Sequence, residues 1–110
     1  DPNFRLYVKG GIKAQEVKVE LCNGWCDYVF DKRYNLPSLT EVKNFINTNG
    51  HLPNIPSEKE MIQNEGIELG KMKTMQQEKI EELFLYVIQL DEKIQKLESE
   101  NLILKTKISK

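Results

Sequence analysis

The fold of this chain is decided by residues 80–108, which read IEELFLYVIQLDEKIQKLESENLILKTKI. An apolar residue recurs there at steps of three and four, the spacing that brings side chains onto one stripe of a coiled-coil helix. No Gly or Pro interrupts residues 71–110, so we expect one helix roughly 60 Å long. The stripe, called the seam below, consists of Ile80, Leu83, Val87, Leu90, Ile94, Leu97, Asn101, Leu104 and Ile108.

The seam predicts that the helix pairs with copies of itself, because nothing else in 110 residues is large enough to cover it. With Ile80 at heptad position a, the a positions are mainly β-branched and the d positions are leucines. Lys93 at position g would face Glu98 at position e of a parallel neighbour, and Glu100 would face Lys105 in the same way. Both pairs are opposite in charge, which favours parallel helices in register.

The number of helices in the coiled coil is left open by the seam. β-branched residues at a with leucines at d favour a dimer. Residues 83–88 are apolar on every side, which indicates a wide core near residues 80–90 and favours a trimer. Asn101, the one polar seam residue, is expected to penalise slipped alignments at some loss of stability. The alternative is a long helix that packs only against its own chain.

Composition excludes several classes of function. The chain has 16 basic and 17 acidic residues and no basic patch interleaved with aromatic residues, so no nucleic-acid partner is expected. No apolar run approaches about 18 residues, so we expect no membrane span. No phosphate loop, dinucleotide fingerprint or catalytic triad is present, and we expect neither an enzyme nor a cofactor. The start at Asp1-Pro2 leads us to expect a fragment of a longer protein.

Period-two alternation near the N-terminus predicts short β-strands. Apolar residues alternate with polar ones through residues 4–8, 12–14 and 17–21, and Gly10-Gly11 fits a two-residue hairpin turn. The expected fold class is therefore α+β. Its parts are a β-strand stalk end at residues 1–21, a small α/loop domain with capped helices at residues 22–69, and a coiled-coil helix at residues 70–110.

Two capping boxes mark helix starts in the small domain. Residues 38–41 (SLTE) precede a helix predicted to end at Asn49-Gly50, residue types that accept a left-handed C-cap. Residues 57–60 (SEKE) precede a short helix predicted to end at Gly66. Between the two helices, residues 51–56 contain two prolines and are expected to form a loop.

An aromatic cluster begins the small domain. Trp25 and Tyr28, together with His51, form a candidate binding surface for a glycan or a protein. Burial in the core is the alternative for the aromatic residues. Packing at the helix end is the alternative for His51, because no nucleophile motif accompanies it. Glu81 and Glu82 are interpreted as part of a solvated helix face.

Cys22 and Cys26 are the only two cysteines in the sequence. With the single His51 they provide fewer than the four ligands of a structural zinc site, so no metal site is expected within one chain. The two thiols form a candidate disulfide around Gly24 in an oxidising compartment, and two free thiols are the alternative.

Several ordered segments together resemble a known module. They are residues 11–19 (GIKAQEVKV), 27–30 (DYVF), 34–39 (YNLPSL), 50–57 (GHLPNIPS), 66–70 (GIELG) and 79–86 (KIEELFLY). The set resembles the C-terminal module of many secreted surface and tail-fibre-like proteins of Bacteroidota. The architecture is similar to that of the trimeric tail-spike intramolecular chaperones. Some of those cleave themselves beside a Ser-Asp-x-Arg-Leu-Lys motif, which this sequence lacks.

The resemblance implies an extracellular, adhesin-like and fibrous protein that forms oligomers. We expect a module that trimerises parallel chains at the C-terminal end of such a protein and sets their register. The alternatives are a glycan- or protein-binding tip and a C-terminal signal for secretion by the type IX route. Cys26 stands where many relatives have Pro after the Trp, so their local turn is not carried over to this chain.

Overall fold

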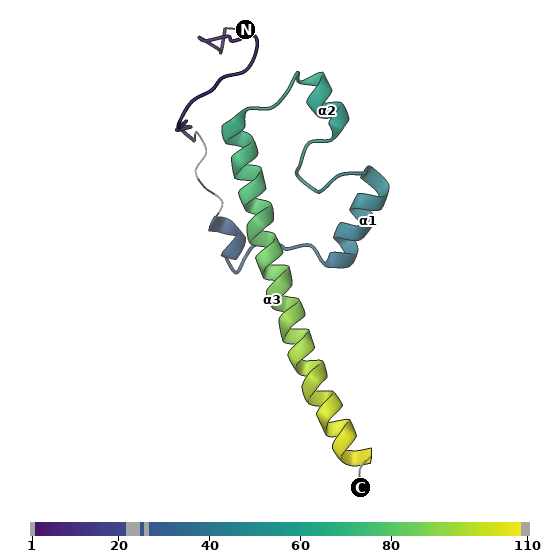
Figure 1. Ribbon diagram of the computed structural model, residues 1–110. Helices are drawn as coiled ribbons and strands as arrows, with labels where there is room; N and C mark the ends of the chain where they lie inside the picture. Colours follow the sequence, from purple (N-terminus) through teal and green to yellow (C-terminus); the bar gives the residue numbers. More distant parts are fainter. Residues whose placement is uncertain (1, 22–24, 26, 109–110) are drawn as a thin grey trace.

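The computed structural model describes residues 2–21, 25 and 27–108, and is organised around one long helix (Figure 1). In chain order its elements are the 3-10 helix η1 (Asp27–Phe30) and the α-helices α1 (Leu39–Asn49), α2 (Glu58–Gln63) and α3 (Leu69–Ile108). The 40 residues of α3 set the shape, which extends 77 × 31 × 30 Å along its principal axes. The predicted long helix is confirmed, and it begins one residue before the expected boundary at residue 70.

The β-strands predicted for residues 1–21 are wrong. Residues 2–21 contain no strand, and the described part of the chain is helical rather than α+β. Alternation of apolar and polar residues produces a stable strand only where a partner strand accepts its backbone hydrogen bonds, and an isolated hairpin is marginal in water. Gly10 does have a positive φ of 128°, but no strand flanks it on either side within the described residues.

The N-terminal segment contacts the start of α3 closely. A Cβ atom at Gly70 would lie 2.6 Å from Val19 Cγ1 and 3.7 Å from Leu21 Cδ2. Val19 and Leu21 therefore pack on the backbone of the first turn of α3, where glycine leaves room that any larger residue would fill. The alternating apolar residues at 19 and 21 thus contact a helix instead of a neighbouring strand.

Both helix starts predicted in the small domain are confirmed. The backbone N–H of Glu41 donates to Ser38 Oγ (3.1 Å) at the start of α1, which is one half of the predicted capping box. At the start of α2 both halves of the capping box are formed, from the Glu60 N–H to Ser57 Oγ and from the Ser57 N–H to Glu60 Oε1. The predicted left-handed cap of α1 is present at Gly50, where φ is 75°.

The second short helix ends earlier than predicted. α2 stops at Gln63, three residues before Gly66. Glu65 and Gly66 both have positive φ, and the Gly66 N–H donates to the carbonyl of Met61 at 2.9 Å. A turn of this kind closes the helix because it satisfies a carbonyl group that would otherwise have no donor.

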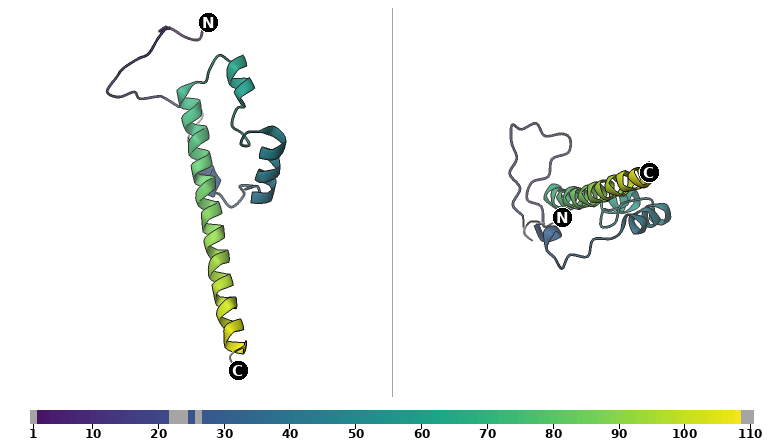
Figure 2. Two further views of the ribbon diagram at one scale, coloured as in Figure 1. Left: turned by 45° about the vertical axis from the view of Figure 1, so that its right-hand side comes forward. Right: turned by 90° about the horizontal axis from the view of Figure 1, so that it is seen from below.

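Residues 38–68, called the arm below, comprise α1, α2 and the loops that join them to each other and to α3. The arm and η1 lie on different sides of α3, and the chain between them passes across the helix (Figures 1 and 2). The C-terminal part of α3 extends beyond both as a bare rod (Figure 2). One helix therefore has a covered part and an uncovered part, and this division defines the candidate site.

Candidate functional site: the two sides of the long helix

Three side chains of α3 are buried by the rest of the chain. Glu81, Glu82 and Tyr86 have exposed fractions of 5%, 5% and 7%. η1 packs against α3, and its Val29 is the most deeply buried apolar side chain among the described residues. The interpretation of Glu81 and Glu82 as a solvated face is wrong, because residues about 50 positions earlier in the chain fold over them.

Two tyrosines donate hydrogen bonds to carboxylates of α3. Tyr34 Oη donates to Glu82 Oε2 at 2.6 Å, and Tyr28 Oη donates to a carboxylate oxygen of Glu78. Lys79 Nζ lies 2.8 Å from Glu82 Oε1 and 3.4 Å from Glu78 Oε1. A carboxylate in a buried position is tolerated when it is paired and hydrogen-bonded, and Glu82 has both kinds of partner.

Tyr86 connects α3 to the beginning of the arm. Its hydroxyl donates to the backbone carbonyl of Pro37 at 2.7 Å. Burial raises the pKa of Tyr86, and the carboxylates of Glu82 and Glu41 raise it further. Burial also raises the pKa of Tyr34, and its hydrogen bond to Glu82 acts in the same direction. Both phenols therefore keep their protons, and remain hydrogen-bond donors, throughout the physiological pH range.

The buried residues of α3 all lie off the seam. In the heptad that the seam defines, Glu81 and Glu82 occupy positions b and c, and Tyr86 occupies position g. At the same level of the helix the seam stays open to solvent, with exposed fractions of 46% for Ile80, 60% for Leu83 and 60% for Val87. The chain thus covers α3 at positions b, c and g and leaves its apolar stripe uncovered.

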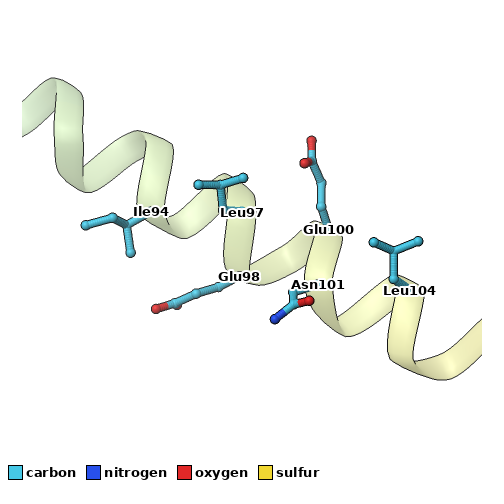
Figure 3. Close-up of a pocket in the computed structure, with 6 residues that line it drawn as sticks. All are labelled: Ile94, Leu97, Glu98, Glu100, Asn101 and Leu104. Atoms are coloured by element: carbon cyan, nitrogen blue, oxygen red, sulfur yellow. The ribbon is translucent and has the colours of Figure 1, made fainter.

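The C-terminal part of α3 is uncovered on all sides. Every residue from Val87 to Ile108 is exposed. Figure 3 shows Glu98 and Glu100 pointing to opposite sides of the helix, with seam residues between them. The residues shown there line a shallow surface on one helix rather than an enclosed cavity; they are Ile94, Leu97, Glu98, Glu100, Asn101 and Leu104.

The residues predicted to form interchain ion pairs lie along this bare part. Lys93, Glu98, Glu100 and Lys105 are all exposed on α3. They flank the seam at positions g and e, where a parallel neighbour would meet them. Asn101 is exposed in the same stretch and lies on the seam, at a position where an apolar side chain would be expected.

The structure does not bring the candidate binding residues together. Tyr28 is in η1, with its ring centroid 5.8 Å from that of Tyr34, and Trp25 is half-exposed shortly before η1. His51 lies in the arm, at the end of α1, and its ring meets that of Phe45 edge-on at 5.4 Å. The arm, which carries His51, and η1, which carries Tyr28, lie on different sides of α3 (Figure 1).

A cavity of about 130 Å³ lies between α3 and the first part of the arm. Its walls on α3 are two turns of one helix face, and the opposite walls come from α1 and the segments before and after it. The lining residues are Lys79, Glu82, Leu83 and Tyr86 on α3, with Pro37, Leu39, Val42, Leu52 and Pro53 opposite. Sequence reasoning missed this cavity, because no local pattern connects walls that lie some 40 positions apart.

The candidate disulfide between Cys22 and Cys26 lies outside the described residues. Within the described ranges, no group of three or more His, Cys, Asp or Glu side chains is arranged to hold a metal ion. None of the helices in these ranges is both long enough and apolar enough to cross a membrane.

Comparison of the chain with models of protein families, with curated proteins and with solved structures found no match. Its function is therefore inferred from the two sides of α3. One side is covered by the chain itself, and the other presents a continuous apolar seam with charged flanks.

Proposed function

We propose that this chain is an oligomerisation module whose α3 helices associate in parallel and in register as a homotrimer. The observation that carries the proposal is the heptad phase of the residues that the chain buries by itself. Glu81 and Glu82 lie on the outer side at positions b and c, and Tyr86 lies beside the seam at position g, whereas seam residues from Ile80 to Ile108 remain exposed. Removing apolar surface from water contributes about 25 cal/mol per Å², so a stripe of this length strongly favours association.

The charges beside the seam support one alignment of the copies. A parallel, in-register neighbour pairs Lys93 with Glu98 and Glu100 with Lys105, whereas an antiparallel neighbour would set g positions against g positions. Each exposed pair contributes only roughly 0.2–1 kcal/mol. The pairs therefore select the register, and the apolar seam provides most of the stability.

Three helices are favoured over two by the width of the apolar face at the beginning of the seam. Leu83 is a seam residue, and Phe84 beside it at position e is also exposed. A two-stranded coiled coil buries mainly positions a and d, so its seam alone would not cover the ring of Phe84. A third helix, with the arms around it, offers more surface to cover this flanking residue.

Such a module would act on the whole protein through proximity. Contacts between neighbouring turns of a helix have low sequence separation, and a coiled coil assembles quickly for this reason. Once joined, the chains hold their remaining segments at a high effective concentration. We place this role at the end of a secreted fibrous surface protein on the basis of the resemblance described for residues 11–86.

A pair of matched substitutions tests the proposal. Leu97 and Leu102 lie on the same bare part of α3 with exposed fractions of 62% and 67%, but only Leu97 is on the seam. We expect the unsubstituted chain and Leu102→Glu to sediment as trimers at micromolar concentration, and Leu97→Glu to sediment as a monomer. A monomeric unsubstituted chain, or equal behaviour of the two variants, would contradict the proposal.

The two alternative functions are a binding tip and a C-terminal secretion signal. A binding tip that uses Trp25, Tyr28 and His51 is less favoured, because η1 with Tyr28 and the arm with His51 lie on different sides of α3. The secretion-signal alternative stays a prediction. Deletion of this module from its longer protein, followed by a measurement of export, would test it.

A further inference from the structure

Phe84 is an apolar side chain that neither the chain's own packing nor the seam accounts for. Its exposed fraction is 63%, and it occupies heptad position e, directly beside seam residue Leu83. An aromatic ring contributes a large apolar area when buried, so a ring left beside a closing interface favours any pocket within reach. The question is which part of a neighbouring copy lies opposite this ring.

The charged pairs beside the seam identify the residue of a neighbouring copy that lies opposite Phe84. Lys93 with Glu98, and Glu100 with Lys105, each join a g residue to the e residue five positions later on the neighbouring helix. Lys79 is the g residue two heptads before Lys93, so the same register joins Lys79 to Phe84 of the neighbour. In the described structure Lys79 forms part of the wall of the cavity between α3 and the arm.

The cavity suits a phenyl ring in size and lining. Its volume is about 130 Å³, and a cavity of about 150 Å³ with aliphatic walls accepts a benzene molecule. Leu39, Leu52 and Leu83 contribute apolar atoms to it. The polar atoms of the other lining residues are already engaged within the chain, since Glu82 is paired with Lys79 and the Tyr86 hydroxyl donates to Pro37.

The cavity is also continuous with the proposed interface, because Leu83 belongs both to the seam and to the cavity wall. A neighbour that covers Leu83 on the seam therefore brings its own flank to the cavity opening. The arm packs against α3 at positions g and c. In a parallel coiled coil, position g of one helix faces position e of the next, so the arm lies on the side that the neighbour's Phe84 approaches.

We propose that Phe84 of a neighbouring copy of this chain inserts into the cavity between α3 and the arm, so that each arm is completed by the next chain. This inference rests on the proposed parallel, in-register association. It adds a specific contact to that association, and it makes the packing of the arm against α3 depend on assembly.

Cross-linking between differently tagged chains tests the contact. In a background with Cys22→Ser and Cys26→Ser, a mass-tagged Leu52→Cys chain is unfolded and refolded together with a Phe84→Cys chain, and then mildly oxidised. We expect a mixed disulfide product well above that of the control mixture of Leu52→Cys with Leu85→Cys, since Leu85 lies at the outer position f. The background chain is sedimented in parallel.

The outcomes separate the two proposals. A trimeric mass with mixed product no greater than in the control would overturn the Phe84 contact and leave the oligomerisation module standing. A monomeric mass would overturn both.

A thermodynamic measurement gives a second test that does not depend on cysteine reactivity. Truncating a buried aromatic anchor at an interface weakens association strongly, so Phe84→Ala should raise the dissociation midpoint concentration roughly tenfold or more. Leu102→Ala removes a side chain of similar exposure from the outer position b and should change it by less than about twofold. Equal shifts for the two variants would overturn the inserted ring.

Discussion

The two parts of α3 obtain their stability from different sources, although they form one uninterrupted helix. From Leu69 to Tyr86 the outer side is covered by η1, the N-terminal segment and the arm, and it accepts hydrogen bonds from two tyrosines. From Val87 to Ile108 every side chain is exposed. Most helices in proteins are stabilised by packing of their apolar face rather than by propensity. The first part can therefore be stable within one chain, whereas the second would be covered by other copies in the proposed association.

The largest expected effect is on the bare part when assembly is blocked. In monomeric Leu97→Glu, we expect amide protons of residues 91–108 to lose nearly all protection from hydrogen exchange, because nothing covers that part of the helix. Amides of residues 72–86 should keep measurable protection. Hydrogen exchange followed by mass spectrometry distinguishes the parts, with Leu102→Glu as the control. Equal protection along α3 in the monomer would break the comparison.

A smaller effect is expected from the buried carboxylate of the covered part. Glu82→Ala leaves the Tyr34 hydroxyl and the Lys79 ammonium without their shared acceptor in a largely buried place, at a cost of roughly 3 kcal/mol in the free energy of unfolding. Glu92→Ala, at an exposed outer position, should change it by less than about 0.5 kcal/mol. Urea unfolding at one fixed chain concentration measures both. A loss for Glu82→Ala no larger than for Glu92→Ala would remove the structural role of this cluster.

The smallest expected effect is on the pH dependence of stability. Burial raises the pKa of Tyr34 above its ordinary value of 10.0. Above about pH 10 the unfolded chain releases this proton while the folded chain retains it, so the unfolded state binds fewer protons and the free energy of unfolding falls as pH rises. Tyr34→Phe should flatten that decline between about pH 10 and 11. Tyr7→Phe, at a fully exposed position, should keep the original slope, and identical slopes for all three chains would exclude the Tyr34 contribution.

Features set by neighbouring residues were predictable from the sequence. Ser57 with Glu60 forms its capping box, and Gly50 closes α1 in the left-handed conformation, because these bonds involve residues three or four positions apart. The seam was equally readable, since its spacing of three and four is a property of the helix itself. The exposed seam within one chain was expected for the same reason.

Features that depend on distant residues were missed. Glu81 and Glu82 look like any acidic pair on a helix surface, and only folding of residues 27–37 over them makes them buried. The strands predicted for residues 1–21 failed for a related reason: alternation shows which side chains share a face, but not whether a partner strand exists. Val19 and Leu21 contact a helix instead, at the one glycine in the first turn of α3.

The attachment of the arm has a consequence for how this molecule can vary. The arm leaves α3 near Tyr86, through the bond to Pro37, and returns at Leu69, about 25 Å back along the same helix at 1.5 Å per residue. Extra residues between α2 and α3, away from the cavity walls at Leu52 and Pro53, would enlarge this closed detour without disturbing the rest of α3. One extra residue in α3 would instead rotate everything that follows by about 100° and abolish the proposed match between chains. The arm can therefore vary in length, whereas α3 cannot.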